Sequence, residues 1–339
     1  MRSILLSSIA LAVFAAWAVP ATAGEADAPP PPSAESTACC CQPIECCKCG
    51  WTVSGSALLL KVRRTDTEYA IVEADGQAPV GDGGVRELDF DHDLGFRTGI
   101  RWATGAPCCW DFGVTGTFLS TDASDSVSVN QPSFILSPTG GGFASAAASI
   151  DEDYLVVDLD VGHTFCGPCL EARVFGGLRF ASIQEDRSRT YVSQAVMGPP
   201  FTIGISESTD AIAVGIHAGI EPRWRICRNF SVFGRIGAGI LFGDFDWTHQ
   251  ETNTQNPGLT VIALDKSLEQ DLTVIEGALG VSWECDRLFG CVGVRVSAGI
   301  EHTRWDFVDF KAGPSIPNVE VSDSAYSVGG FFLNVDLTF

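Results

Sequence analysis

The sequence predicts an all-β protein, an antiparallel transmembrane β-barrel of about ten strands, with a range of about 8 to 14. Three observations lead to this fold class. Apolar and polar or small residues alternate with a period of two in ten segments, which is typical of strands with one apolar face. The connections between these segments alternate between short and long. The chain is also apolar and acidic at once, because 45% of its 339 residues are hydrophobic while its formal net charge is −21.

Two segments precede the predicted barrel. Arg2, the apolar residues 4–19 and the small residues Ala21-Thr22-Ala23 form the three parts of a secretory signal peptide, so residues 1–23 are expected to be removed on export. Residues 24–50 are rich first in proline and then in cysteine, a composition that does not form a packed element by itself. They are expected to form a periplasmic tether, and residues 51–339 the barrel.

The alternation defines the strands in order. They are predicted at 51–62, 94–102, 110–119, 154–165, 170–182, 211–226, 230–243, 272–284, 292–302 and 326–339. The first is the least regular, because Leu58, Leu59 and Leu60 interrupt the alternation. Short connections are expected at 103–109, 166–169, 227–229 and 285–291, and long ones at 64–87, 121–151, 184–210, 244–271 and 306–323. This is the plan of an outer-membrane barrel with short periplasmic turns and long extracellular loops, and a soluble β-sandwich is the alternative.

The polar face of the predicted strands carries charges of both signs, as expected for a lumen with paired ions. The predicted pore-lining residues are Arg97, Arg101, Asp111, Asp158, Asp160, Glu171, Arg173, Arg179, Glu221, Arg223, Arg235, Glu276 and Arg295. Aromatic residues flank the short turns on the apolar face, where they would lie at a membrane interface. These are Trp51, Trp102, Trp110, Phe165, Trp224, Phe230 and Trp283. The last strand ends in Phe339, which resembles the signal that outer-membrane proteins present to the barrel assembly machinery.

The composition excludes several classes of protein. Phosphate binding requires clustered Lys and Arg, and the chain has only four lysines, so nucleic acid is not an expected partner. Helical membrane spans are not expected either, because no apolar run of 18 or more residues follows the N-terminal segment.

Several strand motifs resemble those of a known family. They are Gly50-Trp51 leading into Leu58-Leu59-Leu60-Lys61, the strand Gly95-x-Arg97-x-Gly99-x-Arg101-Trp102 followed by Trp110-Asp111, and the terminal aromatic strand. Over roughly residues 50–339 the chain resembles the Legionella-type major outer membrane protein family of pore-forming proteins. The resemblance implies a single β-barrel in the outer membrane of a Gram-negative-type bacterium that passes small solutes.

The thirteen cysteines all fall in the tether or at the short turns, and hence on the predicted periplasmic side. That compartment favours disulfides, and the candidates are Cys166 with Cys169 and Cys285 with Cys291. An odd count leaves one thiol free or intermolecular, so a disulfide-linked envelope partner or a homo-oligomer is expected. A thioredoxin-like role of Cys166-Gly167-Pro168-Cys169 is disfavoured, because a strand rather than a helix follows. No metal site is expected, because the tether cysteines lack the paired spacing of zinc ligands.

The predicted function is passive diffusion of small solutes or ions, with a weak preference for cations at an acidic mouth, and without a cofactor or catalysis. The first alternative is a structural barrel whose lumen is blocked by ion pairs. The second is an omptin-like surface protease using Asp91-His92-Asp93 or Asp244, Asp246 and His249. The expected partners are outer-membrane lipid and lipopolysaccharide, together with the barrel assembly machinery.

Overall fold

The computed structural model describes most of the predicted barrel. The described residues are 49–73, 84–105, 109–130, 133–137, 142–193, 200–227, 229–254, 260–285, 292–312 and 319–339. The predicted signal peptide and nearly all of the predicted tether, residues 1–48, lie outside them. No helix in the described part of the chain is long and apolar enough to cross a membrane.

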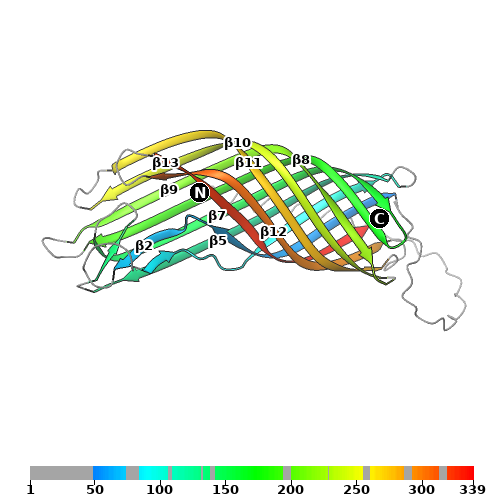
Figure 1. Cartoon of the computed structure of the whole chain (residues 1–339), viewed down its shortest axis with the longest axis horizontal. Helices are drawn as coiled ribbons and strands as arrows, with labels where there is room; N and C mark the ends of the chain where they lie inside the picture. Colours follow the sequence, from blue (N-terminus) through cyan, green and yellow to red (C-terminus); the bar gives the residue numbers. More distant parts are fainter. Residues whose placement is uncertain are drawn as a thin grey trace, which may run out of the picture. The chain divides into compact units, whose positions relative to one another are not determined.

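Ten long strands form one closed antiparallel ring, in which each strand slants around the barrel (Figure 1). Their bounds are β1 (Gly50–Arg64), β4 (Asp93–Ala103), β5 (Trp110–Ser128), β7 (Phe143–Cys166), β8 (Leu170–Ser193), β9 (Thr202–Arg225), β10 (Phe230–Asn253), β11 (Thr260–Cys285), β12 (Gly293–Ala312) and β13 (Val319–Thr338). The ring closes where β13 pairs with β1, with Phe331 opposite Leu59. The C-terminal Phe339 continues this pairing, because its backbone N–H donates to the carbonyl of Trp51 at 2.8 Å. Its predicted role as an assembly signal stays a prediction.

Three short strands are not part of the ten-strand ring, and the sequence analysis did not predict them. They are β2 (Glu68–Glu73), β3 (Gly84–Glu87) and β6 (Phe134–Leu136). β2 pairs with both β3 and β6, and β6 pairs with β7 through Ile135 and Phe143. The described chain therefore has thirteen strands, and each of the ten predicted segments lies within a ring strand or extends beyond its end by one residue.

The ring strands extend further than predicted, so four of the five predicted long loops are mostly strand. The β7–β8 pairing, for example, continues outward to Phe143 and Ser193, through much of the predicted loop at 121–151. The prediction stopped too early because it placed apolar residues only on the outer face. In the extensions the alternation continues with the opposite polarity, since Ile150 is buried inside the barrel while Asp151 and Asp186 are exposed outside.

The barrel wall thus has two zones. In the half that contains both termini of the ring, apolar side chains cover the outer face, as lipid requires. Examples are Ile216, Phe242 and Phe331, which are 65%, 64% and 59% exposed. We call this zone the membrane band. Beyond it, the outer face is polar and the inward side chains form an apolar core.

Glycines on the inner wall bring neighbouring strands close together, and Gly177 is the tightest case. A Cβ at this position would collide with the backbone carbonyl of Leu159, whereas a Cβ at Gly116 would have no heavy atom within 4 Å. We expect Gly177→Ala to destabilise the folded barrel by about 1–3 kcal/mol, and Gly116→Ala to leave it unchanged or slightly more stable. Urea unfolding of the refolded proteins in detergent measures both. Equal stabilities would show that the strands relax around the added methyl group.

Candidate functional site in the barrel lumen

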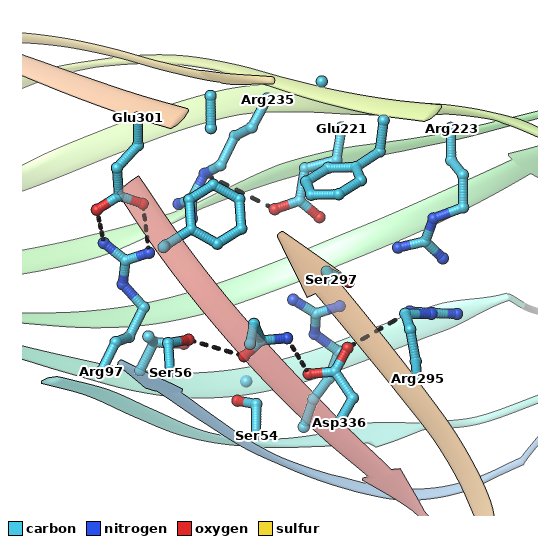
Figure 2. Close-up of a pocket in the computed structure, with 18 of the residues that line it drawn as sticks. Ser54, Ser56, Arg97, Glu221, Arg223, Arg235, Arg295, Ser297, Glu301 and Asp336 are labelled. Atoms are coloured by element: carbon cyan, nitrogen blue, oxygen red, sulfur yellow. Dashed lines mark hydrogen bonds and ion pairs between the residues drawn. The ribbon is translucent and has the colours of Figure 1, made fainter. Parts of the chain in front are cut away.

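The lumen inside the membrane band contains a polar cavity of about 240 Å³ (Figure 2). Eight of the thirteen predicted pore-lining residues line it: Arg97, Arg101, Asp160, Glu221, Arg223, Arg235, Glu276 and Arg295. They come from β4, β7, β9, β10, β11 and β12. Five of these eight are arginines and three are carboxylates, so the cavity wall carries charges of both signs.

Ion pairs cross the lumen at the outer side of this cavity. Arg97 on β4 donates two hydrogen bonds to Glu301 on β12, both 2.8 Å long, which gives the bidentate geometry seen in Figure 2. Arg179 on β8 contacts both carboxylate oxygens of Asp158 at 2.6 and 2.8 Å and reaches Glu276 on β11 at 2.8 Å. The Arg97–Glu301 and Arg179–Glu276 pairs join strands that are not neighbours in the ring, so they cross the lumen. Asp158, by contrast, lies directly opposite Arg179 on the neighbouring strand β7.

A second group of ion pairs lies nearer the short turns of the barrel. Arg173 on β8 contacts Asp111 on β5 at 2.7 Å and Glu221 on β9 at 3.2 Å. The remaining predicted residue, Glu171, lies opposite Arg223 in the β8–β9 register. The thirteen predicted residues are therefore brought to one inner surface.

The prediction missed three carboxylates of this surface: Glu284, Glu301 and Asp336. Arg295 contacts Glu284 at 2.5 Å and approaches Asp336 at 3.7 Å. Asp336 also lies directly opposite Arg295 in the β12–β13 register. The signal was present in the sequence, because all three fall on the polar phase of predicted strands.

An aromatic layer lies directly outward of the charged cavity. Tyr154 on β7 meets Trp305 on β12 edge to face, with ring centroids 6.1 Å apart, and stacks on Tyr326 of β13 at 6.2 Å. β7 and β12 lie five positions apart in either direction around the ten-strand ring, so the first contact spans the full diameter. Trp305 and Tyr326 are both 0% exposed. Water therefore does not reach the lumen at this level, where Leu241, Leu272 and Val274 complete the layer.

The predicted interface aromatics lie on the outer face near the short turns. Trp51, Trp102, Trp110, Phe165, Trp224 and Phe230 are 37% to 64% exposed, and Trp283 is half-buried. Trp51 and Trp102 are cross-strand partners whose rings lie 6.4 Å apart.

The predicted disulfide cysteines lie at two of the short turns. Cys166 ends β7 and Cys169 directly precedes β8, while Cys285 ends β11 as a free thiol. Cys291 falls outside the described residues. Because Cys285 is a free thiol, the predicted Cys285–Cys291 disulfide is not formed. The pairing of Cys166 with Cys169 stays a prediction.

The two groups of protease candidates do not form a common site. His249 faces the inside of β10, where it is 3% exposed and hydrogen-bonds to Glu207 at 3.0 Å. Asp244 and Asp246 are exposed on the opposite face of the same strand, and Asp91 and His92 are exposed before β4. This arrangement leaves His249 without either predicted aspartate as a partner, and the absence of catalysis stays a prediction.

A closed antiparallel ring with an apolar outer band and a polar lumen defines the class of outer-membrane β-barrels. Residues 43–339 match the sequence profile described as Legionella pneumophila major outer membrane protein precursor. The chain belongs to this family and is an outer-membrane protein of the Gram-negative type. No curated protein sequence matches it.

Several solved structures are similar to this chain at low sequence identity. The outer membrane protease OmpT from Escherichia coli is 11% identical with a TM-score of 0.47, and the match covers 86% of this chain and 97% of OmpT. The toluene transporter TodX from P. putida is 8% identical with a TM-score of 0.33, covering 86% and 90% of the two chains. The translocator domain of the autotransporter NalP from Neisseria meningitidis is 11% identical with a TM-score of 0.34, covering 86% and 89%. No statement about function follows from these similarities.

Proposed function

We propose that this chain is a structural outer-membrane barrel whose lumen is sealed, and that it does not act as a permanently open pore. The observation that carries the proposal is the contact between Tyr154 and Trp305 across the full diameter of the ring. A side-chain layer that excludes water leaves no path for a hydrated ion. Lipid and lipopolysaccharide around the apolar band and the assembly machinery remain its proposed partners.

The size of the ring supports a sealed lumen. Barrels of about eight strands have an interior that side chains can just fill, whereas porins with about 16 to 18 strands leave an aqueous channel. Ten strands lie close to the smaller limit. The bonds from Arg97 to Glu301 and from Arg179 to Glu276 narrow the lumen further below the aromatic layer.

A pore that passes small solutes is the second candidate, and the polar cavity favours it. Its volume of about 240 Å³ could hold several water molecules, each of which takes about 30 Å³ in the liquid. Arginines and carboxylates on its wall are the groups that set ion preference in channels. In this candidate the aromatic layer would have to move before solute could pass.

Single-channel recording in a planar bilayer separates the two functions. The purified, refolded full-length protein is added to the bilayer at neutral pH, and its insertion is verified by an antibody to an exposed loop. We expect no unitary conductance above that of the bare bilayer. Steady, reproducible conductance steps from the unaltered protein would overturn the sealed barrel and establish the pore, while leaving the fold unchanged.

A further inference from the structure

The segment at residues 65–73, which includes β2, lies inside the outer mouth of the barrel. Figure 1 shows β2 at the end of the ring away from the C-terminus. The hydroxyl of Tyr69 donates to Asp125 of β5 at 2.8 Å, and the hydroxyl of Tyr191 of β8 donates to the carbonyl of Tyr69 at 2.6 Å. Because Asp125 and Tyr191 face inward, these bonds hold the segment against the inner wall at β5 and β8, the two strands that flank β7. Tyr69 is 1% exposed there.

A buried ion cluster fastens the start of this segment. It contains two arginines, Arg64 and Arg187, and the carboxylates of Asp66, Glu185 and Glu152. Asp66 contacts Arg64 at 3.1 Å and Arg187 at 3.0 Å. Glu185 also contacts both arginines, Arg187 at 2.9 Å and Arg64 more closely. The five side chains are 0% to 9% exposed, so the cluster is shielded from water.

Glu152 is the carboxylate with the poorest partners in this cluster. Its Oε2 lies 3.5 Å from the Nη1 of Arg64, and its side chain is 0% exposed. Its Oε1 has no hydrogen-bond partner among the described residues. If all three carboxylates were ionised, the cluster would carry three negative charges against two positive ones. An uncompensated charge in such a place is costly, and a buried carboxyl group commonly avoids this cost by keeping its proton.

We propose that Glu152 is a proton-operated latch for the mouth of the barrel. While Glu152 is protonated, the charges of the cluster balance and residues 65–73 stay docked against β5 and β8. When Glu152 loses its proton, the excess negative charge weakens the cluster, and the segment undocks so that water can reach the carboxylates. The latch acts at the mouth and does not depend on whether the lumen conducts ions.

The electrostatic surroundings of Glu152 set the pH range of the latch. Burial raises the pKa of Glu152 to about 7, Arg64 of β1 opposes this shift, and the charge of Glu185 of β8 adds to it. The side chain of Tyr326 of β13 also faces Glu152 and opposes the rise in the pKa of Glu152. Burial raises the pKa of Tyr326 itself well above the ordinary value. Glu152 lies outside the membrane band, because its neighbours Asp151 and Asp153 are on the outer face of β7.

The sign of the pH dependence follows from linkage. The docked state has the raised pKa, and the undocked state has one near the ordinary value of about 4.5. Stabilisation of the docked state is therefore complete below about pH 4.5 and is lost as the pH rises to about 7. Undocking should become about tenfold more favourable for each pH unit in this range and should level off above it.

A second carboxylate, Glu207, lies near the cluster but changes its protonation state in a different pH range. Burial opposes its ionisation, but the hydrogen bond with His249 and the charges of Arg189 and Arg187 lower the pKa of Glu207 to about 2. This shift has the opposite sign, so its contribution is lost only as the pH falls from about 4.5 towards 2. It does not overlap with the range assigned to Glu152.

Hydrogen exchange of the segment 65–73 in the refolded full-length protein tests the latch. Exchange is followed by mass spectrometry from pH 5 to pH 8 and divided by the rate of an unstructured reference peptide, which removes the intrinsic pH effect. We expect the corrected rate of this segment to rise about 100-fold between pH 5 and pH 7 and then to level off. In Glu152→Gln, which stays neutral, we expect slow exchange throughout this range.

Two control variants separate Glu152 from its neighbours. Asp153→Asn changes the next carboxylate on β7, and His249→Gln removes the nearby imidazole. Both variants should keep the wild-type pH profile.

A protonated-carboxyl band in the infrared spectrum should be present at pH 5, disappear by pH 8 and be missing in Glu152→Gln. A corrected exchange rate that does not change with pH, or an unchanged profile in Glu152→Gln, would overturn the latch. Loss of the pH dependence in His249→Gln would overturn the latch as well, because it would assign the titration to the imidazole.

Discussion

Replacing Tyr154 and Trp305 together by alanine should turn a silent barrel into one that conducts ions. These two side chains meet across the diameter of the ring and exclude water from the lumen. Their removal would join the cavity in the membrane band to the outer half of the lumen. We expect discrete unitary conductance steps in planar bilayers under conditions in which the unaltered protein gives none.

Stability and chemistry have to be controlled in this experiment. Truncation of a buried aromatic side chain costs about 3–5 kcal/mol, so folding of each variant is checked by its gel mobility with and without heating. Trp224→Ala with Trp102→Ala is a matched control, because it removes two tryptophans that are 64% and 37% exposed on the outer face. This control should stay silent. A folded Tyr154→Ala/Trp305→Ala variant without conductance would show that the aromatic layer does not by itself close the lumen.

Replacing Arg179 by methionine should be the most destabilising change in the charged lumen. Arg179 is 3% exposed and bonds to both oxygens of Asp158 and to Glu276. Glu276 would keep Arg235 at 3.0 Å, but Asp158 would lose both of these bonds in a site where its side chain is 9% exposed. Removing one partner of a buried pair costs about 3–5 kcal/mol, because the other charge stays buried without compensation.

Urea unfolding of the refolded protein measures this loss. Arg304→Met is the matched control, because Arg304 pairs with Asp306 at 2.9 Å while its side chain is 56% exposed. An exposed pair contributes about 0–1 kcal/mol, so we expect little change in this variant. Equal effects of the two substitutions would mean that water reaches Arg179 as readily as it reaches Arg304.

The ten ring strands and the positions of the short turns could be predicted from the sequence, because alternation reports which side of a strand faces lipid. The lengths of these strands could not be predicted from the sequence. Phe242 is the last apolar residue of β10 that faces outward, whereas Phe245 and Trp247 face inward. Only this change in the phase of the apolar residues marks the outer edge of the membrane band. A pattern that assigns every apolar residue to lipid ends the strand at this point.

The lumen shows a similar division. Charged residues on the polar face could be assigned to the inside from their spacing alone, as for Arg97 and Arg235. Their partners could not, because the Arg97–Glu301 bond depends on how the ring closes. The ion cluster around Glu152 was missed for the same reason as the strand extensions, since Arg64, Glu152 and Glu185 all fall where loops were predicted or at their borders. β2 and β6 are too short to give a periodic signal.

The reversal of polarity along each strand means that the two halves of the sheet are stabilised in different solvents, one in lipid and the other in water. In the membrane band, transfer of the outer side chains into lipid and the need to satisfy backbone hydrogen bonds favour the ring. In the outer half, the favourable term is removal of inner apolar side chains from water, as in a soluble protein. A change of lipid or detergent therefore acts mainly on the membrane band, while temperature and salt in the aqueous phase act mainly on the outer half. The two ends of the same strand should melt under different conditions.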